Sequence, residues 1–239
     1  MAVLLEAALN GGRSRDEHPS IPRTPDELAL AALRAVEAGA RVLHIHAYDS
    51  DGAETFEAAA CAAALQAVRA SCPDIAISLT TSASIEPDPL GRFEAISRWT
   101  ELPDLVTANQ GEQGIVQLCE HLIKRNVGIE AGLLSVTDAE KFVASGFADR
   151  CVRVLVEPLD ADPERAVAQA AVMEETVAAV TSLEQVHHGD GIASWAVSVR
   201  GLGRGHGIRT GLEDTTVLPD GRTAGDNAEL VRVAAAMIA

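Results

Sequence analysis

The chain has 239 residues, of which 47% are hydrophobic and 3% aromatic, and its formal net charge is −16. This length and hydrophobic content allow a sizeable core, in one large domain or two small ones. A chain this acidic repels nucleic acids and anionic membranes, so we expect neither as a partner. An anionic small substrate stays compatible with a locally basic pocket.

The four cysteines are dispersed along the chain and form no C-x-x-C pair. The amino-terminal apolar segment is short and lacks the basic region of a signal peptide. No apolar stretch approaches the ~18 residues of a membrane span. We therefore predict a cytoplasmic protein with reduced, mostly buried thiols.

Short apolar segments alternate with longer amphipathic ones along the chain. The first amphipathic segment begins with Thr24 as N-cap, Pro25 in the first turn and Glu27 three residues after the cap. Gly39 marks its end. Further helices are predicted to begin near Ala53, Pro89, Gln113, Asp138, Pro163, Ile192 and Asp226. The predicted strands cover residues 2–9, 41–47, 75–81, 104–109, 127–133, 152–158, 183–188 and 207–213.

Regular alternation of strand and helix favours a parallel sheet with right-handed crossovers. Eight such units in a chain of this length predict one closed (β/α)₈ TIM barrel over residues 1–239. The alternative is an open doubly wound sheet, but no G-x-G-x-x-G follows the first strand. The glycine-rich segment 201–207 follows a helix and precedes a strand, which is the wrong order for a phosphate-binding turn.

Polar residues gather at the predicted strand ends, where the active sites of such barrels lie. In chain order they are Asn10, Arg13, His44, His46, Asp49, Thr80, Thr81, Ser82, Thr107, Asn109, Glu130, Glu157, His187, His188, Arg209, Glu213 and Asp214. Adjacent strand residues face opposite sides, so at most one of the histidines 187 and 188 enters the barrel. The hydroxyl residues 80–82 have a second interpretation, as a loop that satisfies its own backbone.

His44 and His46 lie two residues apart, so their side chains share one face of a strand. Two imidazoles side by side suit a divalent metal that still needs a carboxylate. Glu213 is the best candidate, because strand eight neighbours strand one, which neighbours strand two. Two histidines and one carboxylate form a known catalytic zinc set, and ferrous iron is the alternative metal. The competing interpretation is a histidine pair satisfied by hydrogen bonds in the core.

Four segments together resemble the beta-keto acid cleavage enzyme family. They cover residues 9–52, which include "VLHIHAYDSDG", then "SLTTS", "LVTANQG" and "GIRTGLEDTTVLPDGRTAGDNAELV". The resemblance implies a (β/α)₈ barrel, a zinc ion and a homo-oligomer. It also implies the family's reaction, in which a β-keto acid and acetyl-CoA give acetoacetate and the CoA thioester of the shortened acid.

The resemblance also implies roles for individual residues. The zinc ligands fall on His44, His46 and Glu213, and the pair that supports proton abstraction falls on Arg209 and Asp214. The hydroxyl residues near the substrate carboxylate fall on Thr80 and Thr107, and we expect Thr81 and Asn109 at the same substrate site.

Two positions depart from the family pattern. Arg13 replaces a glutamate of the best-known member, and Tyr48 replaces an arginine found in many members. A guanidinium at position 13 favours a substrate whose distal group is anionic or neutral and polar. Alternatively, Arg13 turns outward or pairs with an acid such as Glu130 or Glu157. We also expect His188 in the substrate pocket, because it precedes a glycine near the barrel mouth.

Two other functions compete with acyl exchange. One is a zinc-dependent barrel lyase or hydrolase that does not use acetyl-CoA, because CoA is anionic and no basic loop stands out. The other is a ligand-binding barrel with a structural metal. Asp214 beside an open metal position argues against the second of these.

Overall fold

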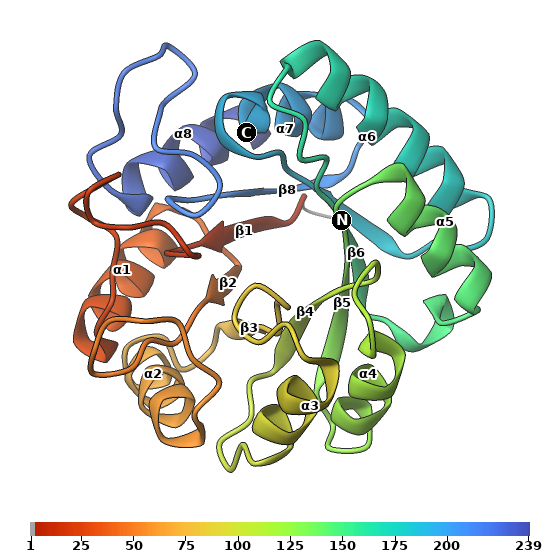
Figure 1. The fold of residues 1–239 in the computed structure, drawn as a ribbon. Coiled ribbons are helices and arrows are strands. Elements are labelled where there is room, and N and C mark those ends of the chain that lie inside the picture. Colours follow the sequence, from red (N-terminus) through yellow and green to blue (C-terminus); the bar gives the residue numbers. More distant parts are fainter. Residues whose placement is uncertain (1–2) are drawn as a thin grey trace.

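In a computed structural model that describes residues 3–239, eight parallel strands form a closed barrel in the order β1 to β8. Eight helices surround it in a ring (Figure 1). The strands are β1 (Leu5–Ala8), β2 (Val42–Ile45), β3 (Ala76–Thr80), β4 (Leu105–Asn109), β5 (Gly128–Leu133), β6 (Arg153–Val156), β7 (Glu184–His187) and β8 (Gly207–Thr210). The helices are α1 (Pro25–Ala38), α2 (Ala58–Ser71), α3 (Pro89–Ser97), α4 (Ile115–Ile123), α5 (Val136–Ser145), α6 (Pro163–Ala178), α7 (Ser194–Gly203) and α8 (Asn227–Ile238).

The predicted (β/α)₈ barrel is therefore confirmed, and every predicted strand overlaps an observed one. Position 2 of the first predicted strand lies outside the described residues. The expected start of α1 is confirmed, because Thr24 and Glu27 form a reciprocal capping box. Gly39 ends the helix with a φ of 125°, a conformation that favours glycine.

The predicted strands extend one to three residues beyond the observed ones at one or both ends, and two boundaries were wrong for local reasons. Helix α2 begins at Ala58 and not near Ala53, because residues 48–54 fold back and pair Tyr48 with Glu54 in an antiparallel bridge. Strand β8 ends at Thr210 because the chain turns sharply at Gly211. A Cβ on Gly211 would lie only 1.9 Å from the carbonyl oxygen of Ala8, so only glycine fits beside β1.

The core fills the space between the barrel and its helices with small aliphatic side chains. Cys61, Cys72 and Cys119 are buried free thiols, and Cys151 is partly buried. Burial raises the pKa of Cys61 and Cys119 to about 12, so these thiols are unreactive. Among the described residues, no helix is both long and apolar enough for a membrane span.

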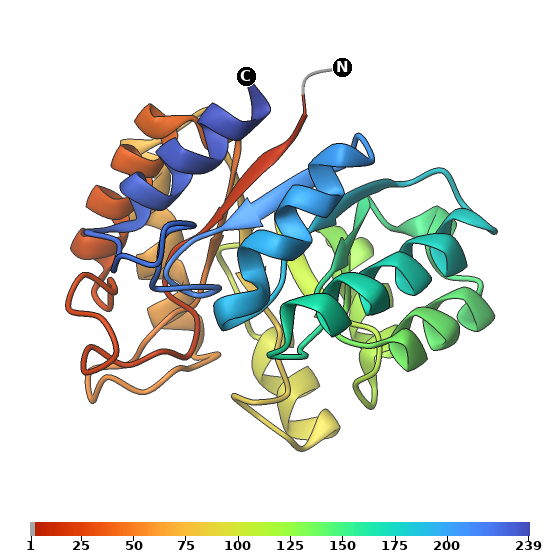
Figure 2. The same cartoon turned by 90° about the horizontal axis from the view of Figure 1, so that it is seen from above.

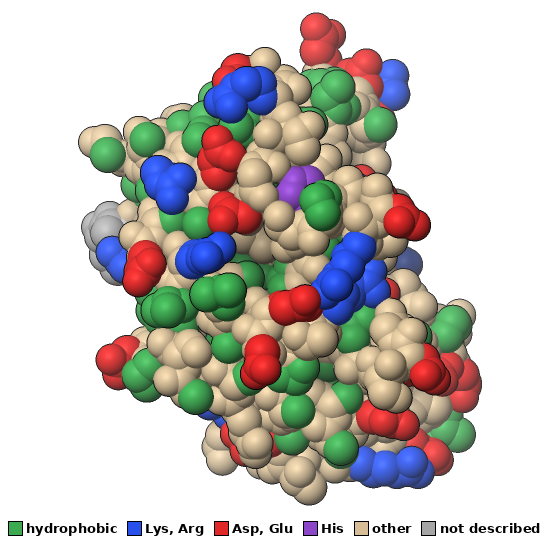
Figure 3. Space-filling model, turned by 90° about the vertical axis from the view of Figure 1, so that its left-hand side faces the viewer, with side chains coloured by type: hydrophobic (Ala, Val, Ile, Leu, Met, Phe, Trp, Pro, Cys, Tyr) green, Lys and Arg blue, Asp and Glu red, His purple; other side chains and the backbone are tan. Residues whose placement is uncertain are grey.

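The loops after β1, β2 and β3 extend from one end of the barrel, at the bottom of Figure 2. This is the carboxyl end of the strands, where the polar residues of the predicted site stand. On the face in Figure 3, acidic and basic side chains are interspersed with hydrophobic ones, and no continuous basic area is visible there.

Candidate metal and catalytic site

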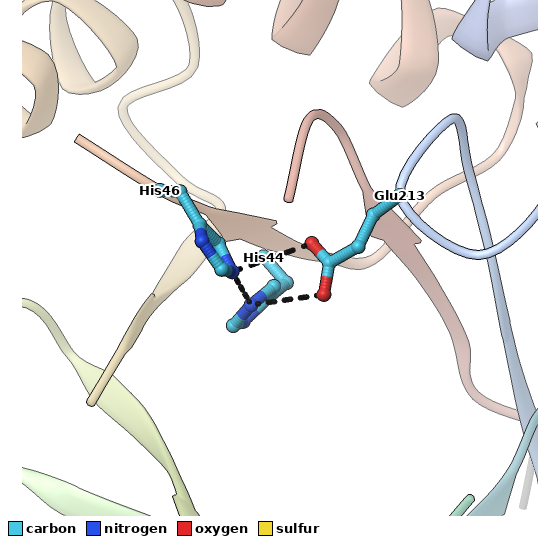
Figure 4. Close-up of side chains that lie close together, drawn as sticks. All are labelled: His44, His46 and Glu213. Carbon is cyan, nitrogen blue, oxygen red and sulfur yellow. Dashed lines mark hydrogen bonds and ion pairs between the residues drawn. The ribbon is translucent and has the colours of Figure 1, made fainter. Parts of the chain in front are cut away.

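His44, His46 and Glu213 converge at the mouth of the barrel (Figure 4). The Nε2 atoms of the two imidazoles lie 3.2 Å apart. Glu213 Oε1 lies 3.5 Å from Nε2 of His44, and Glu213 Oε2 lies 3.6 Å from Nε2 of His46. Two imidazole nitrogens, from the carboxyl end of β2, and the two oxygens of one carboxylate, from the loop after β8, thus face one another at the mouth.

Local backbone geometry brings the carboxylate to the histidines. His44 lies on β2, and His46 follows the strand directly, so both side chains face inward. Glu213 lies three residues beyond β8, in the turn that Gly211 permits. Gly11, with a φ of 56°, leaves space for the glutamate, since a Cβ there would lie 2.4 Å from Glu213 Cγ.

The donor set fits a divalent metal ion. In a tetrahedral site with bonds of about 2.1 Å, donor atoms lie about 3.4 Å apart, close to the three separations above. Glu213 Oε2 is buried and has no hydrogen-bond partner among the described residues. Burial, with help from the charge on Arg209, holds the pKa of His44 well below its usual range, so this imidazole is neutral and can act as a ligand.

Arg209 and Asp214 form a buried ion pair beside these residues. Arg209 Nη2 lies 2.6 Å from Asp214 Oδ1 and 3.0 Å from Glu213 Oε1. Burial is the largest single influence and opposes ionisation of Asp214, but the Arg209 guanidinium and the neighbouring His188 together outweigh it and hold the pKa of the carboxyl below its usual value. Glu213 is affected in the same way. Asp214 is thus a charged, oriented carboxylate next to the candidate ligands.

The two neighbouring histidines at the end of β7, His187 and His188, face opposite sides of the barrel wall. His188 faces inward, where its Nδ1 lies 3.6 Å from Asp214 Oδ1 and its Nε2 lies 3.7 Å from Glu157 Oε2. Burial raises the pKa of Glu157. His187 faces outward and stacks on His206, with ring centroids 4.6 Å apart.

Only one of the expected hydroxyl and amide residues reaches the three-residue cluster. Thr107 Oγ1 lies 3.2 Å from His44 Nδ1 and 3.5 Å from Glu130 Oε2. Thr80 accepts a hydrogen bond from the backbone of its own loop, and Thr81 donates to the carbonyl of Thr107. Asn109 donates to the carboxylate of Glu112 at 3.0 Å.

Arg13 lies at the rim and holds the loop after β8. Its Nε donates to the carbonyl oxygen of Glu213 at 2.8 Å, and its Nη atoms pair with Glu17 and Asp190. Its acidic partners are thus neither Glu130 nor Glu157. Tyr48 donates to the carbonyl of Gly11 and stacks under the guanidinium of Arg23, so it anchors two loops.

Two residues near the cluster were not predicted. Glu54 Oε1 lies 2.5 Å from His46 Nδ1, and Ser78 Oγ lies 3.4 Å from His44 Nδ1. Ser78 had a usable signal, because it shares the inward face of β3 with Thr80, two residues later. Glu54 had none, because its position depends on the loop that folds back after β2.

A second group of two histidines and a glutamate lies outside the barrel, between α6, α7 and the strands. Glu174, His187 and His206 each offer a ligand atom within 4.8 Å of the others. However, Glu174 already pairs with Arg200 at 2.6 Å and Arg204 at 3.0 Å. These cations compete with a metal ion for the carboxylate.

Comparison with known proteins identifies one family over most of the chain. The model of the beta-keto acid cleavage enzyme family matches residues 2–146 and 160–239. A 3-keto-5-aminohexanoate cleavage enzyme from Fusobacterium nucleatum subsp. nucleatum is 27% identical over 252 residues, which cover 96% of this chain and 88% of that protein.

Solved structures of ObcA share the fold. Its apo form, its ternary complex with a C4-CoA adduct and oxalate, and its binary complex with oxaloacetate match with TM-scores of 0.70, 0.67 and 0.66. Sequence identity is 17–18%, and each match covers 90% of this chain. The chain spans only 61–62% of the length of ObcA. At this identity the likeness concerns the fold alone.

Proposed function

The chain belongs to the beta-keto acid cleavage enzyme family, and from this premise we propose that it exchanges acyl groups between a β-keto acid and acetyl-CoA. The products are acetoacetate and the CoA thioester of the shortened acid. The observation that carries the proposal is the convergence of His44, His46 and Glu213 beside the ionised carboxylate of Asp214.

We assign zinc to the three-residue cluster, with His44, His46 and Glu213 as its ligands. Bound there, zinc would act as a Lewis acid that offsets the negative charge of the substrate carboxylate and of the enolate. Two neutral imidazoles and one carboxylate leave an open position, as catalytic zinc sites do.

Asp214 is the general base in this proposal. The C2 hydrogens of a β-keto acid lie between a ketone and a carboxylate, and Asp214 takes one of these protons. Arg209 keeps the base ionised and orients it, because its guanidinium contacts both carboxylate oxygens of Asp214, at 2.6 and 3.3 Å. The enolate carbon then attacks the acetyl carbon of acetyl-CoA and expels the CoA thiolate. The thiolate adds to the original ketone carbon of the substrate, the bond between this carbon and C2 breaks, and the acetoacetate enolate takes the proton back from Asp214.

The substrate site lies on the open side of the mouth. We propose that Thr80, Thr81, Thr107 and Asn109 border the carboxylate end of the substrate, with His188 on the opposite side. Thr107 supports this best, because its hydroxyl already lies beside His44. In the present geometry Thr81 bonds to the backbone of β4 and Asn109 to Glu112, so their contribution requires a change of partners.

We propose an anionic or neutral polar distal group for the substrate. Arg13 stands at the rim, and its guanidinium is held only by half-exposed acids and by backbone carbonyls. An anionic group could replace Asp190 on this guanidinium. ObcA, which shares the fold, binds oxaloacetate, a β-keto diacid, and a CoA adduct.

The decisive experiment incubates the zinc-loaded protein with a panel of β-keto acids, with and without acetyl-CoA. We expect acetoacetate and a new acyl-CoA only when both substrates are present. Cleavage without acetyl-CoA would instead show a lyase or hydrolase. Preference for amino-bearing acids would contradict the proposed distal group. The expected homo-oligomer is tested on the same sample by light scattering.

A further inference from the structure

Glu54 contacts one of the two histidines and has no role in the reaction proposed above. Its Oε1 lies 2.5 Å from His46 Nδ1, the ring nitrogen that faces away from Glu213. The Glu54 side chain is 22% exposed and comes from the loop between β2 and α2. The position of Glu54 is set by this loop and not by the alternation of side chains along β2, which places the histidines.

The loop holds Glu54 in place through its backbone. Asp49 accepts hydrogen bonds from the backbone of Asp51 and Ala53 with one carboxylate oxygen, which closes a tight turn. The backbone of Thr55 then donates to the carbonyl of Ala47. This fold-back returns Glu54 to the ring of His46. On the other side, a Cβ on Gly12 would lie 3.0 Å from Glu54 Oε2, so the carboxylate also packs on the first loop.

This contact selects the form of the imidazole. A carboxylate beside Nδ1 accepts a hydrogen bond, so the proton of the neutral ring stays on Nδ1. The lone pair is then on Nε2, which lies 3.2 Å from Nε2 of His44 and 3.6 Å from Glu213 Oε2. A carboxylate on the far nitrogen also makes the imidazole a stronger ligand.

His44 has a different environment. Its Nδ1 lies beside two hydroxyls, Ser78 Oγ at 3.4 Å and Thr107 Oγ1 at 3.2 Å. These groups are neutral and can donate or accept, so they select the ring form less strongly than a carboxylate does. The two histidines of the cluster are therefore supported unequally.

We propose that Glu54 is a positioning residue that holds His46 in the Nδ1–H form, with Nε2 directed at the metal. This inference rests on the proposed metal site, because it concerns the same three ligands. It adds a fourth side chain on which the affinity of the site depends, located in a loop and not on the barrel.

The test compares Glu54→Gln, Glu54→Ala and the control Glu57→Gln, which removes an exposed carboxylate three residues away. Zinc affinity is measured by competition with a chromophoric chelator, and the ring form of His46 by ¹⁵N NMR of the metal-free protein. We expect the alanine variant to bind zinc about 10- to 100-fold more weakly and to lose the uniform Nδ1–H form. The glutamine variant keeps an acceptor and should lie between alanine and wild type. Glu57→Gln should match wild type.

Thermal unfolding of the metal-free variants separates positioning from folding, since a positioning role leaves their melting temperatures close to wild type. Unchanged zinc affinity and an unchanged ring form in Glu54→Ala would overturn the inference while leaving the proposed function intact. Weaker zinc binding in Glu54→Ala, combined with no acyl exchange by wild type, would support the inference and refute the function. Absence of zinc binding by wild type would overturn both.

Discussion

Two clusters of this protein contain the same residue types, two histidines and a glutamate, and are similarly buried, yet they differ in the direction of the lone pairs and in the pairing of the glutamate. In the inner cluster, two Nε2 atoms and the two oxygens of the Glu213 carboxylate converge, with N–N and N–O separations of 3.2 to 3.6 Å. In the outer cluster, the rings of His187 and His206 are stacked with an interplanar angle of 6°. Lone pairs in the planes of two parallel rings cannot both point at one ion.

The two glutamates differ as well. Glu213 pairs with one arginine through Oε1, and among the described residues its Oε2 contacts His46 only, whereas both carboxylate oxygens of Glu174 pair with arginines. Glu174 faces Arg200, Arg204 and His206, and its pKa falls to about 2 because these partners outweigh its burial. Proximity of ligand-type residues therefore does not define a metal site. Convergent lone pairs and an incompletely paired carboxylate make the inner cluster the better candidate.

The strongest test of this contrast removes one histidine from each cluster. We expect His44→Ala to lose bound zinc and to reduce turnover by about 10³-fold or more, because the Lewis acid is lost. His206→Ala should retain both zinc and activity. Metal content by mass spectrometry and acetoacetate formation give the two readouts. Equal zinc loss in both variants would place a second metal in the outer cluster.

Asp214→Asn should separate catalysis from metal binding within the inner cluster. The amide retains the shape of the side chain but cannot take the C2 proton, so we expect kcat to fall by about 10²- to 10⁴-fold. Zinc content should not change, because Asp214 is not among the proposed ligands. Exchange of the substrate C2 hydrogens with solvent deuterium reports the same step, and near-normal exchange would contradict the role of base.

Strand parity and barrel closure made the inner cluster predictable from the sequence. An H-x-H pair on strand two and a carboxylate after strand eight meet because β8 pairs with β1 and β1 pairs with β2. The chain turn at Gly211 was not predictable, because it depends on contact with Ala8, about 200 residues away. Glu54 and the partners of Arg13 were missed because loops, and not strand periodicity, bring them into place.

Substitution of Arg13, at the rim of the inner cluster, tests whether this residue binds the substrate or only holds the loop after β8. If Arg13 binds the distal group, Arg13→Glu should lower kcat/KM for β-keto diacids by about 10- to 100-fold, since a charge-assisted contact contributes about 1.5–3 kcal/mol. Neutral β-keto acids should be much less affected. Arg15→Glu, the same charge change at an exposed position of the loop, serves as control.

The alternative outcome for Arg13 is equally specific. Its Nε donates to the carbonyl oxygen of Glu213, so a purely structural role would move the ligand and the neighbouring base. In that case kcat would fall for all substrates, and zinc affinity would fall with it. A uniform loss across the panel would therefore contradict the proposed preference for an anionic distal group.

We expect substitutions in the outer cluster to change the stability of the protein and not its catalytic activity. Burial and the charge of His206 lower the pKa of His187 to about 3 from 6.5. Between about pH 3 and pH 6.5, His187 is protonated in the unfolded chain but not in the folded protein. The free energy of unfolding is therefore unaffected by protonation of His187 above pH 6.5 and decreases as the pH falls below that value. The slope is at most about 1.4 kcal/mol per pH unit.

The free energy of unfolding in urea is measured at pH 7 and at pH 5. We expect its decrease between these pH values to be smaller for His187→Gln than for wild type, by about 1–2 kcal/mol. His121→Gln is the control, because His121 is partly exposed and its pKa is lowered to a smaller extent. Identical acid sensitivity of wild type and His187→Gln would mean that His187 is protonated in the folded state. Its stacking on His206 would then need a counter-charge, and Glu174, beside both rings, is the group that could supply it.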